Sequence, residues 1–467
     1  MAKDFIVAIE LGSSKMTGIA GRKNPDGSIS ILAVAKEDSA SYIRKGVAYN
    51  IERTAQGLSN IVSKLKNTLK TEIEQVYVGI GGQSIHSVKN SIVKELPLDC
   101  IVSQDMVNEL MDTNRSMEYK DCEILDAITQ EYNVDGHYED DPVGIQARHL
   151  EGNFLNVLWR RSFYRNLNKS LDNAGIKVAE MYLAPLTMAD CVLTEAEKRA
   201  GCLLVDLGAD TTTVSVYYRN KLRHIAVLPL GGSNVTKDLE SLQIDEINAE
   251  AMKLKHASAL TNEKDIDAEA TLPIDDDRTI LSRKFIQVVE ARMLEIVENV
   301  KYLVPHEFAD KLLGGIVLTG GGSNMKNVDK LFREVFGAEK VRIAKSTTLN
   351  INKKDSDVIL SEDGTTNTIL GLLAKGDMNC AGRAISETLF DEEEEPGSEN
   401  TVSLDPTLAA TGTGAQPAAQ TAAQPAAVAE EEEEEKAPEP HKPTKISRFF
   451  GSLKKFGSSI FEPDVNE

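Results

Sequence analysis

The sequence contains few cysteines and no long apolar run. Its five cysteines are scattered, with an odd total and no CxxC pair, which argues against a disulfide framework and a zinc site. No uninterrupted apolar run reaches the length of about 18 residues that a membrane-spanning helix needs, and the amino-terminal stretch lacks a signal-peptide cleavage pattern. We therefore expect a protein that stays in the cytosol with reduced thiols.

Positive charge is also scarce. Lysine and arginine total 52 against 73 aspartates and glutamates, which gives a formal net charge of −21. Phosphate backbones select positively charged faces, so this balance argues against a nucleic-acid partner. Much of the acidity lies in two glutamate runs near the carboxyl end.

Short β-branched runs alternate with helical patterns from about residue 5 to 375, which predicts an α/β layered fold. At 467 residues the chain exceeds what one hydrophobic core usually supports, so we expect two or more lobes followed by a less ordered part. The pattern of strand, glycine turn, strand and strand occurs twice, in DFIVAIELGSSKMTGIAG and in GCLLVDLGADTTTVSVYY, and it predicts an internal duplication. A stretch between Gln83 and Arg165 fits neither half and is predicted to be an inserted subdomain.

Two glycine turns carry the first functional signal. In IELGSSK, the backbone N–H groups of Gly12, Ser13 and Ser14 can line a phosphate, and Lys15 adds positive charge. Taken alone, this turn is more often a plain hairpin. The turn in VDLGADTTT repeats the spacing of acid, apolar residue and glycine, and it places Asp206 where it can hold Mg²⁺ through water. Together the two turns can clamp a polyphosphate from opposite sides.

A third element, GGIVLTGGGSNMKNVDKLFREVFG, is predicted to be a buried strand, a glycine turn and a helix. Gly320, Gly321 and Gly322 allow a flat base and a ribose to approach the backbone, although a tight strand-to-helix connection is the alternative. Glu250 and Lys253 lie three residues apart on a predicted helix, where they can hydrogen-bond ribose hydroxyls or form an ordinary surface ion pair.

The order of IELGSSK, VDLGADTTT, LTGGGSNM and NTILGLLAKG resembles the phosphate, adenosine and connecting motifs of the actin, Hsp70 and sugar-kinase superfamily. Within it, the chain resembles FtsA, a family of actin-like bacterial cell-division proteins. The stretches that carry this likeness include VYVGIGGQSIHSV, PVGIQARHLEG, LRHIAVLPLGGSNVTKDL and VVEARMLEIVENV, and it extends from about residue 4 to 378.

The resemblance implies a duplicated actin-like (ribonuclease H-like) two-lobed ATPase fold with ATP and Mg²⁺ in the cleft. Its implied metal-binding residues are Glu10 and Asp206. Besides the residues above, the implied nucleotide-binding set includes Gly208, Ala209, Asp210, Thr211, Thr212, Gly231, Gly232 and Ser323. It further implies head-to-tail filaments on membranes and binding of the carboxyl-terminal tail of FtsZ, the tubulin-like ring protein, near Arg292. Taken alone, Arg292 is as readily a solvated helix charge.

Three residues depart from the superfamily pattern. Glu10 stands where most members have aspartate, and Ala209 and Asp210 occupy positions that are usually glycine. Mg²⁺ tolerates little distortion of its ligands, and Asp210 brings negative charge toward the phosphates. We therefore expect ATP binding with at most slow hydrolysis, and no residue is assigned as the catalytic base.

The carboxyl-terminal part changes in composition. Residues 391–443 combine glutamate runs with an alanine- and proline-rich repeat, and they predict a disordered acidic linker. The segment TKISRFFGSLKKFGSSIFEP then predicts an amphipathic helix in a lipid interface rather than a helix packed on the protein's own core. Its predicted membrane-binding residues are Ile446, Arg448, Phe449, Phe450, Leu453, Lys454, Lys455, Phe456 and Ile460.

These predictions divide the chain into segments. They are the first lobe (1–83, 166–200 and 367–390), the inserted subdomain (84–165), the second lobe (201–366), the linker (391–443) and the membrane helix (444–467). The predicted function is a peripheral protein on the cytoplasmic face of the cell membrane at the division site. There it ties FtsZ filaments to the membrane and recruits other division proteins. The alternatives are a small-molecule kinase and a pilus-assembly ATPase of the same superfamily; an Hsp70-like chaperone lacks a folded peptide-binding domain after residue 380.

Overall fold

The structure is a computed structural model that describes residues 4–262, 269–275, 277–352 and 360–384. These residues belong to one compact unit of the chain. The predicted linker at 391–443 and the predicted membrane helix at 444–467 lie outside the described residues. Within the described ranges, no helix is both long and apolar enough to cross a membrane.

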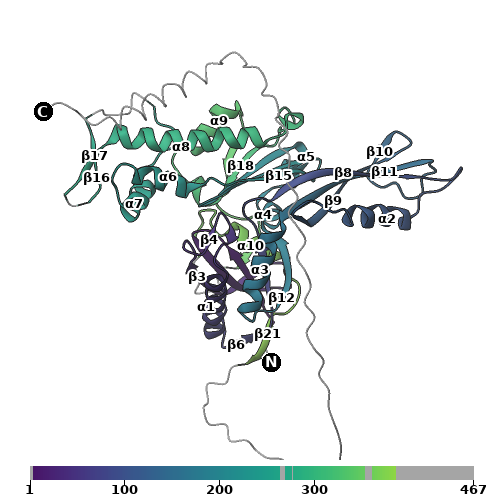
Figure 1. Ribbon diagram of the computed structural model, residues 1–467, viewed down its shortest axis with the longest axis horizontal. Coiled ribbons are helices and arrows are strands. Elements are labelled where there is room, and N and C mark those ends of the chain that lie inside the picture. Colours follow the sequence, from purple (N-terminus) through teal and green to yellow (C-terminus); the bar gives the residue numbers. More distant parts are fainter. Residues whose placement is uncertain (1–3, 263–268, 276, 353–359, 385–467) are drawn as a thin grey trace, which may run out of the picture. The chain divides into compact units, whose positions relative to one another are not determined.

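The first lobe is built on a mixed sheet (Figure 1). Its strand order is β12 (Val178–Leu183), β7 (Val76–Ile80), β1 (Ile6–Leu11), β2 (Lys15–Lys23), β3 (Ile29–Asp38) and β20 (Ile351–Asn352). Strands β1, β2 and β3 form an antiparallel meander, whereas β7 runs parallel to β1 and β12 parallel to β7. Every residue of β7 is buried, as expected for a strand that is covered on both faces.

Helices cover this sheet. They are α1 (Ile51–Leu69), α3 (Arg161–Asn173), α4 (Ala184–Val192) and α10 (Asn367–Lys375). Helix α1 begins where the Asn50 side chain accepts the Arg53 N–H, and it buries Leu58, Ile61 and Leu65 at helical spacing. Helix α10 packs on α4 so closely that a Cβ at Gly371 would lie 2.5 Å from a backbone oxygen of α4.

The second lobe repeats the arrangement of the first. Its strand order is β15 (Lys221–Leu228), β14 (Thr212–Tyr218), β13 (Cys202–Leu207), β18 (Gly315–Thr319) and β19 (Val341–Ile343). An antiparallel meander is again followed by two parallel strands. This common order confirms the predicted duplication.

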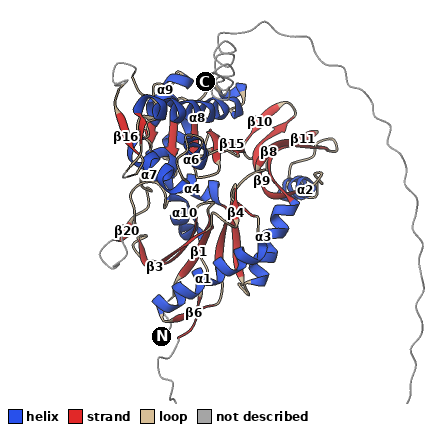
Figure 2. Ribbon diagram, turned by 60° about the vertical axis from the view of Figure 1, so that its left-hand side comes forward, coloured by secondary structure: helices blue, strands red, loops and turns tan. Residues whose placement is uncertain are grey.

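The other elements of the second lobe are mostly helical. They are α5 (Glu195–Ala200), α6 (Gly232–Glu240), α7 (Glu246–His256), the hairpin β16 (Thr271–Pro273) and β17 (Thr279–Leu281), α8 (Ser282–Leu303), the 3₁₀ helices η2 (His306–Phe308) and η3 (Gly321–Asn324), and α9 (Val328–Phe336). Helix α8 packs against both α6 and α9 (Figure 2). It buries Phe285, Val289, Met293 and Val300 along one face.

The inserted subdomain is an antiparallel sheet with one helix. It consists of β8 (His86–Glu95), α2 (Gln104–Arg115), β9 (Cys122–Val134), β10 (His137–Glu139) and β11 (His149–Arg160). Its sheet continues that of the second lobe, because His86 of β8 pairs with Ala226 of β15. Side chains reinforce this joint, where Ser87 Oγ accepts the Ile225 N–H at 3.0 Å.

The remaining strands are short. They are β4 (Ile43–Arg44) with β5 (Val47–Ala48), and β6 (Thr71–Ile73) with β21 (Ala381–Ala384). Two elements lie near the predicted segment limits. Helix α3, which begins at Arg161, packs mainly on α1 of the first lobe and also contacts β9 and β11 of the insert. The chain also reaches the first sheet at β20, before residue 367.

Buried apolar side chains form separate clusters in the described residues. One centres on the first lobe and extends into the second through Cys202 and Leu204. Another fills the second lobe around α8, and a smaller one lies between α2 and the sheet of the insert. Each lobe therefore has its own core, and the base of the second lobe packs on the first.

Candidate functional site

The two predicted acids occupy the same register position in the two halves of the fold. Glu10 lies opposite Thr17 in the β1–β2 hairpin, and Asp206 lies opposite Thr213 in the β13–β14 hairpin. Each acid is followed by a leucine and a glycine, at the point where the first strand of its hairpin ends. The duplication therefore brings equivalent carboxylates from both lobes toward one place.

Both carboxylates have raised pKa values, and that of Glu10 responds to Asp206. Burial, with a further contribution from the Asp206 carboxylate, raises the pKa of Glu10 to about 8, and a hydrogen bond from Thr368 partly opposes this. Burial also raises the pKa of Asp206 to about 6. Both side chains keep some solvent access. Two acids that resist ionisation in this way form a site that favours a cation.

The first phosphate turn, Gly12 to Ser14, connects β1 and β2. The carbonyl oxygen of Gly12 accepts a 2.6 Å hydrogen bond from the Ser39 hydroxyl, and a Cβ at Gly12 would lie 2.5 Å from the backbone oxygen of Lys15. Ser13 Oγ accepts the Gly46 N–H at 2.8 Å. The turn is thus fixed by the segment before α1, while Ser14 and Lys15 are exposed.

The second phosphate turn contains Gly208 to Thr211 and packs on the start of α6. The N–H groups of Gly232 and Ser233 donate to the carbonyl oxygens of Gly208 and Ala209 at 3.0 and 2.7 Å. A Cβ at Gly231 would lie 2.5 Å from the Ala209 oxygen, so glycine is needed there for close approach. The structure therefore brings these predicted residues together. Thr212, also predicted, is buried, and its hydroxyl donates to a backbone oxygen before α6.

The three consecutive glycines end β18 and open η3. Gly320 has φ +82°, and a Cβ there would lie 2.3 Å from Asp206 Oδ1, so its backbone lies directly against the acid. A Cβ at Gly321 would meet only the Thr365 methyl group, at 3.6 Å. Close packing therefore requires a glycine at position 320, whereas position 321 has open space for a Cβ. The Ser323 side chain is buried and donates to the Gly320 oxygen at 2.7 Å.

Glu250 and Lys253 form an ion pair on α7, with Nζ and Oε2 2.6 Å apart. Lys253 Nζ also donates to the Gly232 oxygen at 3.2 Å and to Thr236 Oγ1 at 3.0 Å. The pair thus lies beside the second phosphate turn and not on an isolated surface of the helix.

Arg292 is already engaged within the second lobe. Its guanidinium contacts both carboxylate oxygens of Asp238 on α6, one of them at 2.9 Å, and it also pairs with Glu295. These contacts raise the pKa of Arg292 further. The side chain therefore links α8 to α6, which sequence reasoning did not anticipate.

Sequence reasoning also missed two contributors to the site. Thr368 lies at the start of α10, and its side chain lowers the pKa of Glu10. Lys45 and Gly46 form the turn between β4 and β5, and the Lys45 N–H donates to Asp210 Oδ2 at 3.1 Å. The signal for this second contact was the dipeptide Lys-Gly between two short apolar runs, which is too brief to mark a site by itself.

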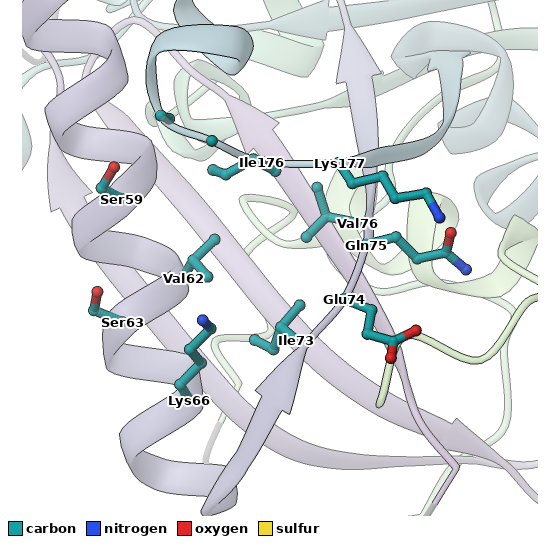
Figure 3. A pocket seen from close by; sticks show the side chains of 12 residues that line it. Ser59, Val62, Ser63, Lys66, Ile73, Glu74, Gln75, Val76, Ile176 and Lys177 are labelled. Carbon is teal, nitrogen blue, oxygen red and sulfur yellow. The ribbon is translucent and has the colours of Figure 1, made fainter. Parts of the chain in front are cut away.

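A cavity of about 150 Å³ lies elsewhere, among α1, β6 and the segment that leads into β12. Figure 3 shows Val62 of α1 and Ile73 of β6 pointing toward each other across it. None of the predicted nucleotide-binding residues lines this cavity.

Comparison with known proteins identifies the family. Residues 203–361 match the family described as "Cell division protein FtsA", and residues 82–158 match the "SHS2 domain inserted in FTSA". The chain is 31% identical to the cell division protein FtsA of Porphyromonas gingivalis over 379 residues, which cover 80% of this chain and 78% of that protein. The chain belongs to the FtsA family.

Other FtsA-family members agree with this assignment. The FtsA of Escherichia coli K12 is 27% identical over 357 residues, which cover 73% of this chain and 84% of that protein. Among solved structures, the type IV pilus biogenesis complex of PilM and PilN superposes with a TM-score of 0.53 at 15% identity, covering 79% of this chain and 97% of that one. This likeness concerns the fold alone. The predicted actin-like α/β fold with an insert is confirmed for the FtsA-family chain.

Proposed function

We propose that this FtsA-family chain binds ATP with Mg²⁺ between its two lobes. The observation that carries the proposal is the convergence of Glu10 and Asp206 from equivalent hairpins, each beside a glycine turn. Turns of this kind present backbone N–H groups to phosphate. The open space beside Gly321 provides for the approach of a base and ribose.

The residues present fit a magnesium ion. Mg²⁺ is usually held by one or two carboxylates together with waters and substrate phosphates, and Glu10 and Asp206 supply such a pair. No group of three or more potential metal-ligating side chains lies together in the described ranges, so the remaining ligands would come from nucleotide and water. Bound Mg²⁺ neutralises phosphate charge and orients the polyphosphate.

Calorimetry with ATP and ADP, with and without Mg²⁺, tests this proposal directly. We expect binding of both nucleotides, weakened tenfold or more in the Asp206→Asn variant, because a charged ligand contact is worth about 1.5–3 kcal/mol. Asp26→Asn is the matched control, since it neutralises an acid in an exposed turn of the first lobe. If the wild-type chain binds neither nucleotide at any Mg²⁺ concentration, the proposal is wrong.

We further propose that the chain ties FtsZ filaments to the cytoplasmic face of the membrane and polymerises there, together with other division proteins. Support comes from membership of the FtsA family and from the sequence pattern of residues 444–467. One amphipathic helix should bind lipid reversibly, and a filament that carries many should bind firmly through effective concentration.

Co-sedimentation with anionic liposomes tests the membrane step. Deleting residues 445–467 should leave the protein in the supernatant. A second variant, with Phe449 and Phe450 changed to serine, keeps every basic residue and separates apolar insertion from charge attraction. Unchanged sedimentation of the deletion variant would remove the tethering proposal.

Negative-stain imaging on lipid monolayers with ATP, with and without the FtsZ tail peptide, tests filament formation and partner binding. It also separates the remaining candidates. A small-molecule kinase would show rapid ATP turnover stimulated by a sugar substrate, without filaments. A pilus-assembly ATPase would not bind the FtsZ tail.

A further inference from the structure

The turn between β4 and β5 presents two amide groups to the phosphate turns. Lys45 and Gly46 have φ values of +51° and +73°, which is the two-residue hairpin turn with both central residues left-handed. In such a turn the hairpin ladder does not use the N–H groups of these central residues. Consecutive N–H groups in a turn form a concavity that binds anions.

Both amides are directed at the phosphate turns of different lobes. The Lys45 N–H donates to Asp210 Oδ2 at 3.1 Å, in the second lobe, and the Gly46 N–H donates to Ser13 Oγ at 2.8 Å, in the first. One of the two acceptors is therefore a carboxylate, which has the charge and the oxygen geometry of an anionic ligand.

The position of the turn is fixed by contacts with the segment that follows β7. The Lys45 carbonyl oxygen accepts the Gln83 N–H at 2.8 Å. A Cβ at Gly46 would lie 2.5 Å from the Gly82 Cα, so the two glycine backbones are in direct contact. The amides are thus held in place before any ligand arrives, which lowers the ordering cost of binding.

We propose that the Lys45 amide binds the terminal phosphate of a nucleoside triphosphate, beside the Gly46 amide that donates to Ser13, and that the Asp210 carboxylate occupies this place when that phosphate is absent. The inference rests on the proposed ATP site. The groups assigned to the adenosine, Gly321 and the Glu250–Lys253 pair, all belong to the second lobe, whereas the turn belongs to the first. The phosphate farthest from the base is the one that reaches it.

In this proposal Asp210 has a specific role, which is to occupy the Lys45 amide until a triphosphate binds. A carboxylate and a phosphate repel each other and compete for the same donors, so the triphosphate displaces Asp210 from the turn. A diphosphate lacks the group that competes, and the contact between Lys45 and Asp210 persists. The contact therefore distinguishes the two nucleotides.

Hydrogen exchange of the Lys45 and Gly46 amides tests the inference in the full chain. Samples are nucleotide-free, with ADP, or with the non-hydrolysable analogue AMP-PNP, all with Mg²⁺, and calorimetry measures binding in parallel. In the Asp210→Ala variant without nucleotide, the Lys45 amide should exchange about tenfold faster than in the wild type. AMP-PNP should restore its protection, and ADP should not.

Asp26→Ala is the matched control, because it removes a carboxylate that accepts the Ser28 amide in a remote turn of the first lobe. If Asp210→Ala lowers stability, Asp210→Asn replaces it, because asparagine keeps the side-chain shape. The Asp210→Asn variant should bind AMP-PNP more tightly than the wild type, whereas its affinity for ADP should be unchanged. If AMP-PNP binds without protecting the turn, or if ADP protects it equally, this inference is wrong while the ATP site stands. If neither nucleotide binds in calorimetry, both are wrong.

Discussion

Burial raises the pKa of Glu10, and the Asp206 carboxylate of the opposite lobe raises it further, although the two residues lie far apart in the sequence. They correspond to each other in the duplicated fold, where each faces a threonine on the return strand of its hairpin. An interaction between such equivalent acids requires both lobes to be in place. A divalent cation between them relieves the repulsion and stabilises the arrangement.

The first prediction concerns Mg²⁺ affinity and pH. Because the pKa of Glu10 is about 8 without metal, the carboxyl must lose its proton when Mg²⁺ binds. Affinity of the nucleotide-bound chain for Mg²⁺ should rise with pH below 8, by up to about tenfold per unit for one released proton. Titration of Mg²⁺ at several pH values in wild type and Glu10→Gln measures this. An equally steep rise in the variant would show that only the nucleotide titrates.

The second prediction concerns stability without metal. The folded chain holds a proton on Glu10 between the ordinary carboxyl pKa and about 8, and the unfolded chain does not. The free energy of unfolding should therefore fall as pH rises through this window, and it should level off above pH 8. Melting temperatures without Mg²⁺ should show a shallower fall in Glu10→Gln. Adding Mg²⁺ at pH 8 should raise the melting temperature of the wild type more than that of the variant.

The third prediction compares neighbouring glycines. Gly320→Ala should destabilise the fold by about 1–3 kcal/mol, because its φ is +82° and its Cβ would overlap Asp206. Gly321→Ala should leave the melting temperature nearly unchanged, because space for a Cβ exists, yet it should weaken ADP binding tenfold or more. Thermal unfolding and calorimetry on both variants measure this. Full ADP affinity in Gly321→Ala would contradict the role of that glycine in nucleotide contact.

The fourth prediction concerns Arg292. Arg292→Ala should lower stability by about 1 kcal/mol, since it leaves Asp238 without its partner at a partly buried position. Lys284→Ala, on the exposed side of the same helix, is the control. Asp238→Asn instead leaves Glu295 as the carboxylate paired with the guanidinium and makes room for another acidic ligand. If Arg292 binds the FtsZ tail, this variant should bind the tail peptide more tightly in fluorescence anisotropy. Unchanged affinity in both Arg292→Ala and Asp238→Asn would leave Arg292 a purely internal contact.

Local patterns predicted the α/β class and the internal duplication, whereas the actin-like fold was implied by the resemblance to the FtsA family. The repeated acid, leucine and glycine at the ends of β1 and β13 marked the duplication, because each half needs the same hairpin. The helical spacing in α1 was equally clear. These features depend on residues that are close in the sequence.

Contacts between distant segments were not predictable in this way. The engagement of Arg292 by Asp238 depends on how α8 crosses α6, and no periodicity within either helix encodes that partner. The turn at Lys45 and Gly46 meets Asp210 only after both lobes have folded. Ser323, which is predicted to contact nucleotide, donates its hydroxyl to the Gly320 oxygen within the 3₁₀ turn, a contact that its sequence neighbours did not indicate.

The chain contains a single tryptophan, Trp159, at the end of β11. It is buried, and its indole N–H donates to the Gln83 oxygen at 3.1 Å, where the chain enters the insert. Its fluorescence therefore reports on the junction between Gln83 and the end of β11, without any added label. Opening of that junction would expose the indole to water and shift its emission to longer wavelength, even while both lobes stay folded. Intrinsic fluorescence therefore detects movement of the insert.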